Sequence, residues 1–394
     1  MRKFLFDLGR EFDFRLRGEY LLPALLLFGI MCVFWAVFFY IPIYLVDLKS
    51  LSEEELSMLL SLFPLTSLLT MFIFGFLSDR FPPQALMRIG LMIFAAFLSA
   101  LKFGTTFSSF IPLFVLGGMG RSLFQVSCYS YYYKILGEAD RGKKLGFFQG
   151  IGLYGYGIGP LVGGRLLANL SFDKLLLLLL IALIPLFLLT FALKKVEPAR
   201  FGIALYKGDL QRKEVLVIAL LVFIMAMHLG AEQTSLSLFL KHHIFLADEA
   251  IGRIFGFVGL AIGSLSILDG FAADYLIRKR RKLSSLLYLG LFCSGLFNIL
   301  TAFTSSFKAV LLMRLLHVFG DSMFGVGQRV VISGIFPKER IGGDMGIVDT
   351  LNQAGLLAGL YLSGFLPGYA LPFIAAGALA IFIIPVAASL KPRF

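Results

Sequence analysis

Long apolar segments recur along almost the whole chain and constrain its fold more than any other feature. A bilayer core of about 30 Å is crossed by a helix of about 20 apolar residues. Segments of that length lie between short polar connections and can be counted. They cover residues 20–45, 56–77, 86–106, 109–134, 144–169, 174–193, 214–241, 249–273, 283–304, 307–335, 342–366 and 369–390. The chain is therefore expected to be an all-α polytopic membrane protein with twelve transmembrane helices.

The composition argues against a soluble enzyme and against a nucleic-acid-binding domain. Hydrophobic residues make up 58% of the 394 residues and charged residues 15%, whereas ordinary globular proteins have about 45–50% and about 25%. The net charge of +12 is spread over the ends of apolar segments and forms no single basic patch. No phosphate-binding loop, metal-ligand spacing or cysteine framework is visible. We therefore expect no cofactor, no metal ion, no nucleic-acid partner and no enzymatic activity.

The basic residues predict the orientation of the chain in the membrane. If the N-terminus is inside, most Lys and Arg residues fall on that same side. The other side receives only Lys49, Lys102, Lys174, Lys241 and Lys308. Cytoplasmic loops are enriched in Lys and Arg, so we expect a multi-pass protein of the cytoplasmic (inner) membrane with both termini in the cytoplasm. No cleavable signal peptide is expected, because the first apolar run is full length.

The two halves of the chain repeat one another. The polar connection 194–213 separates residues 1–193 from residues 214–394, and six apolar segments lie in each part. Two pairs of segments align, Gly75–Asp79 with Gly270–Asp274 and Gly120–Phe124 with Gly320–Phe324. Duplicated units are common in secondary transporters, whose substrate site lies between the repeats near the midplane. We expect two pseudo-symmetric six-helix bundles joined by a cytoplasmic linker.

Three motifs resemble the major facilitator superfamily, and the resemblance covers the whole chain. They are Gly75-x-x-x-Asp79-Arg80 after the second segment, Arg121 with Gln125 in the fourth, and Gly155-x-x-x-Gly159-Pro160-x-x-Gly163-Gly164 in the fifth. The last resembles the motif of proton-coupled exporters. The resemblance implies the fold of that superfamily and transport by alternating access.

One stretch departs from the family pattern. Phe81-Pro82-Pro83-Gln84 stands where the family usually has a Gly and a basic pair. The contact that this motif makes on the cytoplasmic side is therefore expected to be weaker in the first half.

Four ionisable residues within the spans are candidates for proton coupling. His228 and Glu232 are four residues apart and share a helix face, and His317 and Asp321 repeat that spacing. Ionisable groups are rare and costly inside a bilayer, and imidazole titrates near neutrality. Glu232 is the first candidate for the proton-carrying acid. The alternative is a structural carboxylate paired with an Arg of its own half.

Asp321 has several possible partners. It occupies the position that is pseudo-symmetric to Arg121, so a charge pair across a central cavity is one hypothesis. Pairing with Arg314 or Arg329 of the same segment is the other. Substrate contacts are expected from a set of polar residues that could equally form interhelical hydrogen bonds: Arg121, Gln125, Gln149, Tyr154, Gln233, Asn352 and Gln353. Arg165 and Arg253, near the outer ends of their segments, are expected to snorkel to the interface.

Conformational gating is assigned to a second group of residues. Asp79 and Asp274 end their segments on the cytoplasmic side, where a carboxylate can cap the N-terminus of a neighbouring helix. Such a contact would hold the cytoplasmic side shut and break when the carrier switches. Arg80, which follows Asp79 directly, is assigned to the same gating group. Packing and bending are assigned to Gly155, Gly159 and Pro160.

These features predict a secondary transporter that exports a small amphipathic or lipophilic organic solute in exchange for protons. A proton symporter that imports a sugar, nucleoside or carboxylate remains open, as does a lipid or lysolipid translocator. A sensor derived from a transporter is a further alternative. The expected partners are the solute, protons and the bilayer, and a monomer suffices.

Overall fold

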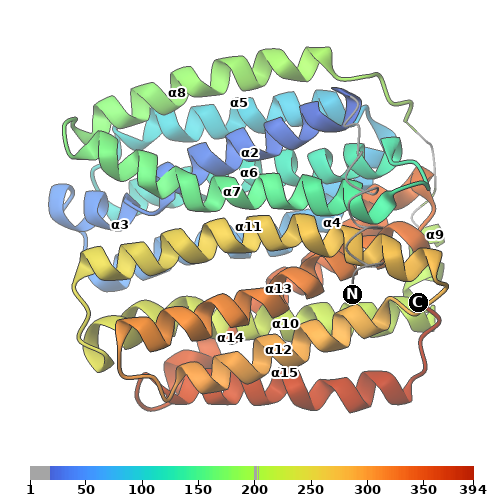
Figure 1. Ribbon diagram of the computed structural model, residues 1–394. Coiled ribbons are helices and arrows are strands. Elements are labelled where there is room, and N and C mark those ends of the chain that lie inside the picture. The colour runs from blue at the N-terminus through green and yellow to red at the C-terminus, as the bar shows by residue number, and fades with distance from the viewer. Residues whose placement is uncertain (1–17, 199–201, 203) are drawn as a thin grey trace.

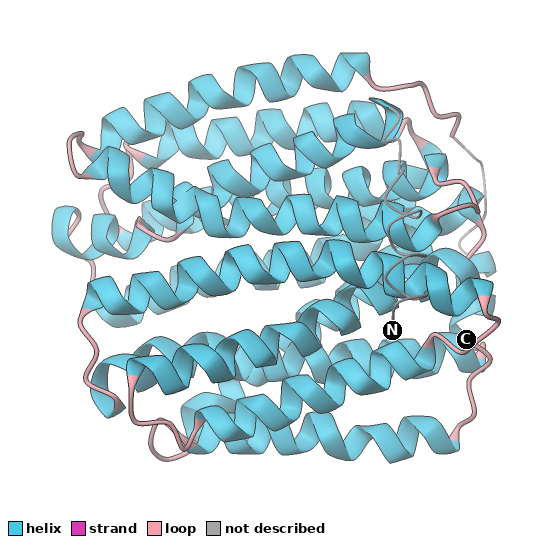
Figure 2. Cartoon of the chain, viewed as in Figure 1, coloured by secondary structure: helices cyan, strands magenta, loops and turns pink. Residues whose placement is uncertain are grey.

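Every regular element in the described part of the chain is a helix (Figure 2). The computed structural model describes residues 18–198, 202 and 204–394. The basic residues expected before residue 18, and residues 199–201 and 203 of the expected linker, lie outside it. The long helices are α2 (Gly18–Phe38), α4 (Glu53–Arg80), α5 (Pro83–Leu101), α6 (Phe107–Ile135), α7 (Arg141–Leu167), α8 (Phe172–Leu189), α10 (Lys213–Leu238), α11 (Asp248–Arg278), α12 (Ser284–Thr301), α13 (Phe307–Ile335), α14 (Ile341–Phe365) and α15 (Leu371–Ser389). The shorter elements are α3 (Ile41–Ile43), η1 (Tyr44–Leu48), η2 (Thr190–Ala192), α9 (Ala204–Leu210), η3 (Phe239–His243) and η4 (Lys338–Arg340).

The long helices run side by side along one axis, with α8 and α15 at the two outer edges and α7 beside α11 in the middle (Figure 1). Ten described helices are long and apolar enough to cross a membrane. The two long helices outside this set, α7 and α14, carry many glycines and polar residues because they face other helices: α7 packs on α2 and α11, and α14 packs on α10 and α4. The predicted all-α membrane fold is confirmed.

Local sequence explains where several helices begin. Ser52 and Glu55 form a capping box at the start of α4, and Thr106 and Ser109 form one at the start of α6. Pro82 and Pro83 separate α4 from α5, since the residue before a proline disfavours helical geometry. These residues set the positions along the bundle axis at which the chain turns from one helix into the next.

The helix directions define two faces of the molecule. The linker face is the end at which α4 and α6 finish, α7 and α14 begin, and α9 lies. The opposite face is the end at which α2 and α10 finish, each followed by a π-helical turn, η1 and η3. The two matching π-helical turns are a further sign of duplication.

Equivalent helix pairs pack in the same way in the two halves. A Cβ atom on Gly90 of α5 would lie 2.7 Å from the amide nitrogen of Phe124 in α6. A Cβ atom on Gly290 of α12 would lie 2.7 Å from the amide nitrogen of Phe324 in α13. Each glycine thus allows two backbones to touch. The repeat predicted from the alignment of Gly120 with Gly320 is visible in this packing, whereas the exact division at residues 193 and 214 stays a prediction.

Gly90→Val and Gly290→Val are expected to destabilise the protein by similar amounts, about 1–3 kcal/mol each, because each added side chain would collide with a backbone. Thermal unfolding of the purified protein, followed by size-exclusion fluorescence, measures the effect. Gly364→Ala is the control, since its Cβ would meet nothing within 4 Å. Unchanged unfolding temperatures in both valine variants would contradict the packing described.

Candidate functional site

A buried polar network lies between α10, α12 and α13. His228 and Glu232 project from one face of α10, and Arg314, His317 and Asp321 project from one face of α13. Helical spacing of three and four residues aligns each set along its helix. The four residues predicted to couple protons are therefore brought together in one cluster. Their role in proton coupling stays a prediction.

Glu232 lies between a guanidinium and an imidazole. Arg314 donates a short hydrogen bond to Glu232 Oε1. His317 Nε2 lies 2.9 Å from Glu232 Oε2 and 3.0 Å from Asp321 Oδ2. The side chain of Arg314 is 1% exposed and that of Glu232 14% exposed. His317 thus bridges two carboxylates inside the helix bundle.

Two uncharged residues of α12 complete the network. Ser294 donates a hydrogen bond of 2.6 Å to Asp321 and lies 3.1 Å from Nε2 of His228. Asn298 accepts a hydrogen bond of 3.2 Å from Arg314. Because Asp321 contacts His317 and Ser294, the hypothesis that it pairs with Arg121, Arg314 or Arg329 is not supported by this structure.

The charges of the network do not balance unless it binds a proton. Glu232 and Asp321 bring two negative charges, and Arg314 brings one positive charge that no accessible pH removes. One excess negative charge remains while both imidazoles are neutral. A carboxylate at the centre of a bilayer costs about 2.5–3.5 kcal/mol. One proton, held by His317 between its two carboxylates, cancels the excess.

Part of the same cluster could ligate a metal ion. One ligand atom each from His228, Glu232 and His317 lies within 4.8 Å of the others. Glu232 already contacts the Arg314 guanidinium, so a divalent cation there would stand beside a fixed positive charge. The electrostatics therefore favour a proton over a metal ion.

Arg121 in the other half has a different environment. Its guanidinium carbon lies 4.2 Å from the centre of the Phe34 ring, a cation–π contact between α6 and α2. Its Nε atom is buried and has no hydrogen-bond partner among the described residues, and the same holds for the side-chain oxygens of Gln125 and Gln149. These three predicted substrate-binding residues therefore offer unsatisfied polar atoms in the N-terminal half.

The remaining predicted substrate residues are dispersed. Tyr154 shares a hydrogen bond of 2.8 Å with Ser264 of α11, so it connects the halves at a partly exposed position. Gln233 is exposed, and Asn352 and Gln353 are partly buried on α14. None of the seven predicted substrate residues lines the pocket described next.

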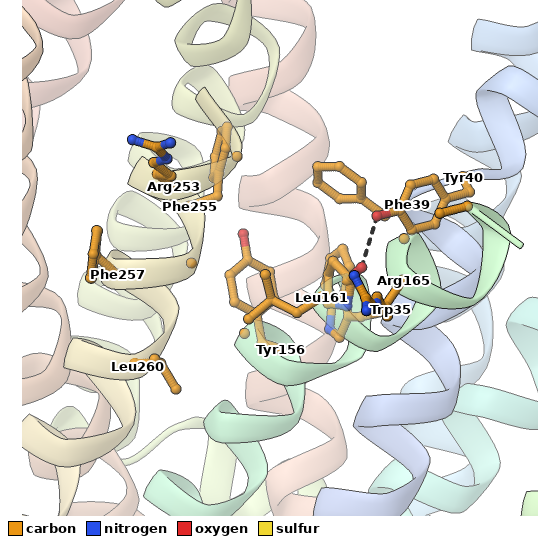
Figure 3. Close-up of a pocket in the computed structure, with 16 residues that line it drawn as sticks. Trp35, Phe39, Tyr40, Tyr156, Leu161, Arg165, Arg253, Phe255, Phe257 and Leu260 are labelled. Atoms are coloured by element: carbon orange, nitrogen blue, oxygen red, sulfur yellow. Dashed lines mark hydrogen bonds between the residues drawn. The ribbon is translucent and has the colours of Figure 1, made fainter. Parts of the chain in front are cut away.

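A pocket of about 660 Å³ lies between α2, α7 and α11 (Figure 3). Aromatic side chains dominate its wall: Trp35, Phe39, Tyr40, Tyr156, Phe255 and Phe257. Its charged lining residues are Arg165 and Arg253, which the sequence predicted only to snorkel. Because α7 ends and α11 begins at the opposite face, both arginines lie towards that face. Pro160 also lines the pocket, and its carbonyl accepts a hydrogen bond of 2.7 Å from Tyr40.

Tyr156 lies in the wall of the pocket and within electrostatic range of the network. Its ring packs edge-on against Trp35 with ring centres 4.6 Å apart. It also lies close enough to Glu232 and Arg314 to interact electrostatically with both. The N-terminal half thus supplies a pocket wall that reaches towards the network of the C-terminal half.

Two aspartates hold the halves together at the linker face. Asp79 of α4 accepts hydrogen bonds from the amides of Gly342 (3.0 Å) and Gly343 (2.7 Å) at the start of α14. Asp274 of α11 accepts hydrogen bonds from the amides of Gly142 (2.6 Å) and Lys143 (2.9 Å) at the start of α7. A carboxylate at a helix N-terminus satisfies free amides and the helix dipole. We call these contacts the first cap and the second cap.

The first cap has partners besides the two amides, although Phe81–Gln84 replaces the expected basic pair; that it is weaker than the second cap stays a prediction. Lys134 lies 3.0 Å from Asp79, and Tyr206 of α9 donates a hydrogen bond of 2.9 Å to it. Burial, with the nearby Asp79 carboxylate, raises the pKa of the Tyr206 phenol, so it remains a donor. Residues from α6 and α9 therefore supply the partners that the expected basic pair would have given. Arg80 instead stacks on Phe76 with 4.6 Å to the ring centre.

Glycines allow the caps and the α2–α7 contact to form. A Cβ on Gly75 would lie 2.2 Å from the carbonyl oxygen of Gly342, and one on Gly270 would lie 2.6 Å from that of Gly142. A Cβ on Gly155 or Gly159 would come within 2.7 Å of backbone oxygens of α2. The helix-five motif is thus a packing surface for α2.

Sequence reasoning missed several residues of the site. Ser294 and Asn298 carry no charge and stand in an ordinary apolar segment, so no signal marks them. Asp269 is a buried carboxylate inside α11 that accepts a 2.5 Å hydrogen bond from Ser322, and its charge within a span was a usable signal. Tyr156 and Trp35 become recognisable only when α2, α7 and α11 meet.

Comparisons with known proteins agree with this architecture. The family model of the Major Facilitator Superfamily matches residues 23–240 and also residues 216–393. Multidrug resistance protein 2 of Bacillus subtilis (strain 168) is 28% identical over 245 residues, which are 58% of this chain and 61% of that protein.

Solved structures share the fold at low sequence identity. The human organic anion transporter MFSD10 (TETRAN) superposes with a TM-score of 0.76 at 16% identity, over 94% of this chain and 98% of that one. A bacterial homologue of the iron transporter ferroportin, in an outward-facing state with soaked iron, superposes with a TM-score of 0.75 at 16% identity. The match covers 95% of this chain and 98% of that one.

Arg314→Met is expected to lower the free energy of unfolding by about 3–5 kcal/mol, because it leaves Glu232 buried without its guanidinium. Glu232→Gln combined with Arg314→Met is expected to recover part of that loss. Thermal unfolding of Arg314→Met, Glu232→Gln and the double variant gives the interaction free energy between the two side chains. Strictly additive effects would show that the two side chains do not interact.

Asp79→Asn with Asp274→Asn is expected to open the linker face. Each cap loses a charge-assisted contact of about 1.5 kcal/mol, which changes the open-to-closed ratio roughly tenfold per cap. Spin labels at the exposed positions Ala139 and Glu339 would report a longer distance. Asp173→Asn, an exposed acid on the opposite face, is the control; an unchanged distance in the double variant would mean that the caps do not gate.

Proposed function

Because the chain belongs to the Major Facilitator Superfamily, we propose that it exports amphipathic organic compounds across the cytoplasmic membrane in exchange for protons. Transport by a multi-pass, non-enzymatic carrier follows from the family. Proton coupling, direction and substrate class are the proposal. The proposal rests above all on the network, which becomes neutral when it takes up one proton. The network lies within electrostatic range of Tyr156 in the wall of the pocket.

The geometry supports an alternating-access cycle. Both caps are formed at the linker face, whereas the pocket lies towards the opposite face. The Lys and Arg distribution supports a cytoplasmic linker face with both termini on that side. The structure then corresponds to a state closed towards the cytoplasm.

The network offers a physical link between proton and conformation. We propose that in this state a proton from outside enters at Glu232, whose side chain is 14% exposed, and removes the excess charge of the network. A neutral network avoids the cost of about 2.5–3.5 kcal/mol that an uncompensated charge carries near the bilayer centre. Release of the proton on the cytoplasmic side restores the charge. The network would thus bind a proton more readily when it is open to the outside than when it is open to the cytoplasm.

The names of two similar proteins support export as the direction of transport and an organic compound as the solute. One relative bears the name of a multidrug resistance protein and one solved neighbour that of an organic anion transporter. All residues of the network and the pocket come from one chain, so a monomer suffices. The bilayer surrounds it, and the solute and the proton are its partners.

Purified protein in liposomes loaded with a pH-sensitive dye tests the proposal. A panel of lipophilic cations, organic anions and sugars is applied, and Glu232→Gln and Asp321→Asn are compared with wild type. A transported compound is expected to drive proton movement in the opposite direction, with at least a tenfold loss in one or both variants. Glu138→Gln, an exposed acid at the linker face, is the matched control and should behave as wild type.

Two results would overturn the proposal. Solute and proton moving in the same direction would establish symport and import. A labelled lipid crossing the membrane with no dependence on a proton gradient would identify a lipid translocator.

A further inference from the structure

A second buried carboxylate in the C-terminal half takes no part in the network. Asp269 lies inside α11, is 5% exposed, and accepts a hydrogen bond of 2.5 Å from Ser322 of α13. Among the described residues no cation pairs with it, and no charged group lies close enough to interact with it electrostatically. A carboxylate that is buried within a membrane span is costly when it is ionised. Asp269 therefore has a physical reason to bind a proton.

The charged groups of the helices around Asp269 have partners of their own. α7 and α13 are the long helices that pack on α11. The pairs on these three helices are Arg141 with the carbonyl of Ser333, Lys143 with Asp140, Arg329 with Asp349, Arg314 with Glu232, Asp321 with His317, and Asp274 with the amides of α7. With a single hydroxyl as its partner, Asp269 also lacks the roughly six or more oxygen ligands that Ca²⁺ or Mg²⁺ takes. A proton is the ligand that fits.

The equivalent place in the first half shows that packing does not require an acid. Ser122 of α6 corresponds to Ser322 in the alignment of Gly120–Phe124 with Gly320–Phe324. Ser122 shares a hydrogen bond of 2.7 Å with Ser67 of α4, and both side chains are buried. α4 packs on α6 as α11 packs on α13. A hydroxyl thus suffices to join these two helices, and the carboxylate of Asp269 is an addition of the second half.

Asp269 lies between the network and the linker face. At about 1.5 Å per residue from the linker-face ends of their helices, Glu232 lies at about 29 Å, Asp321 at about 21 Å and Asp269 at about 14 Å. Ser322, which bonds to Asp269, directly follows Asp321. Asp274 of the second cap stands five residues beyond Asp269 on α11. The carboxylates thus form a series that descends from the network to the linker face.

Close contacts between α7 and α11 separate Asp269 from the linker face. A Cβ on Gly146 would lie 2.5 Å from the carbonyl oxygen of Ser266, and one on Gly270 would lie 2.6 Å from that of Gly142. These contacts stand on either side of Asp269 along α11, and the second cap follows them. α7 and α11 belong to different halves and lie side by side in the middle of the molecule (Figure 1). Parting of the halves at the second cap would therefore expose Asp269 to water from the linker side.

We propose that Asp269 is a second proton-binding site, which holds a proton while the linker face is shut and releases it there when the second cap opens. On release the O–H bond of the Asp269 carboxyl breaks and the proton passes to water. The network then refills the site: an N–H bond of His317 breaks and an O–H bond of Asp269 forms. The inference deepens the proposed function and rests on it for the direction of proton flow.

Infrared difference spectroscopy of the protein in lipid nanodiscs detects this proton, because a protonated carboxyl has a carbonyl stretch that a carboxylate lacks. Wild type and Asp269→Asn are compared over the pH range in which exposed aspartates are ionised. Wild type is expected to show one protonated-carboxyl band more than the variant, and that band disappears as the pH is raised further. Ser322→Ala is expected to shift the band, since the carboxyl loses its hydrogen bond.

Asp173→Asn, which removes an exposed acid, is the control for these spectra and should match wild type. Identical protonated-carboxyl bands in wild type and Asp269→Asn at every pH would overturn the proposal.

Proton movement through the site is measured in the dye-loaded liposomes. Asp269→Asn is expected to slow solute-driven proton movement at least tenfold, and Asp269→Glu is expected to restore most of it, because only the second variant can carry a proton. Ser67→Ala removes the equivalent interhelical hydrogen bond of the first half and should behave as wild type. Proton movement at the wild-type rate in Asp269→Asn would show that the proton does not pass through this site.

The spectra and the transport assay distinguish this inference from the proposed function. The spectra are recorded with no solute and no proton gradient. A band that is lost in Asp269→Asn, with no proton movement in wild type for any solute, would support the binding site and overturn its role in transport together with the proton-coupled function. Solute-driven proton movement in wild type without such a band would overturn the second site alone.

Discussion

A cluster of two carboxylates, one guanidinium and two imidazoles lies between α10, α12 and α13, and its net charge depends on whether it holds a proton. Glu232 and Asp321 share His317, while Arg314 contacts Glu232 and is the only permanently charged base that pairs with either carboxylate among the described residues. In water such an imbalance would cost little. Inside a helix bundle surrounded by lipid it is expensive, because no solvent screens it. The cluster therefore has a physical reason to exchange a proton whenever its access changes.

The two caps are the contacts to which we assign conformational gating. Each is a single carboxylate on the N-terminus of a helix from the other half of the chain, and each can form only where glycines let the backbones touch. The caps join the two halves at the linker face, and the pocket lies towards the opposite face. A carrier that closes one end with a few strong, local contacts can open that end without disturbing its core.

Much of the fold was predictable because its signals are local or repeated. Apolar segments of bilayer length gave the helices, and Asp79 with Asp274 stood out because they end equivalent segments. The clustering of His228, Glu232, His317 and Asp321 followed in part from helical spacing. Which faces meet was beyond the sequence, so Ser294 and Asn298 were missed. The hypotheses for Asp321 named only arginines as partners, whereas it contacts His317 and Ser294.

The pocket was hidden for a related reason. Its wall comes from α2, α7 and α11, which are distant in sequence, and its arginines resemble ordinary interfacial anchors. Polar residues such as Gln233 and Asn352 were chosen because they are polar within a span, but position on the helix face decides contact. The first cap shows the same limit: Lys134 and Tyr206 replace a missing motif from elsewhere in the chain.

The most direct test of the central claim is to observe the proton on the network. The chain has only four histidines, and His242 and His243 are exposed beyond the end of α10. Nitrogen-15 NMR of histidine-labelled protein can therefore resolve the His317 ring and its protonation state. If the network carries the coupled proton, His317 changes between imidazolium and neutral imidazole over the pH range in which transport activity changes. A ring that keeps one protonation state across that range would contradict it.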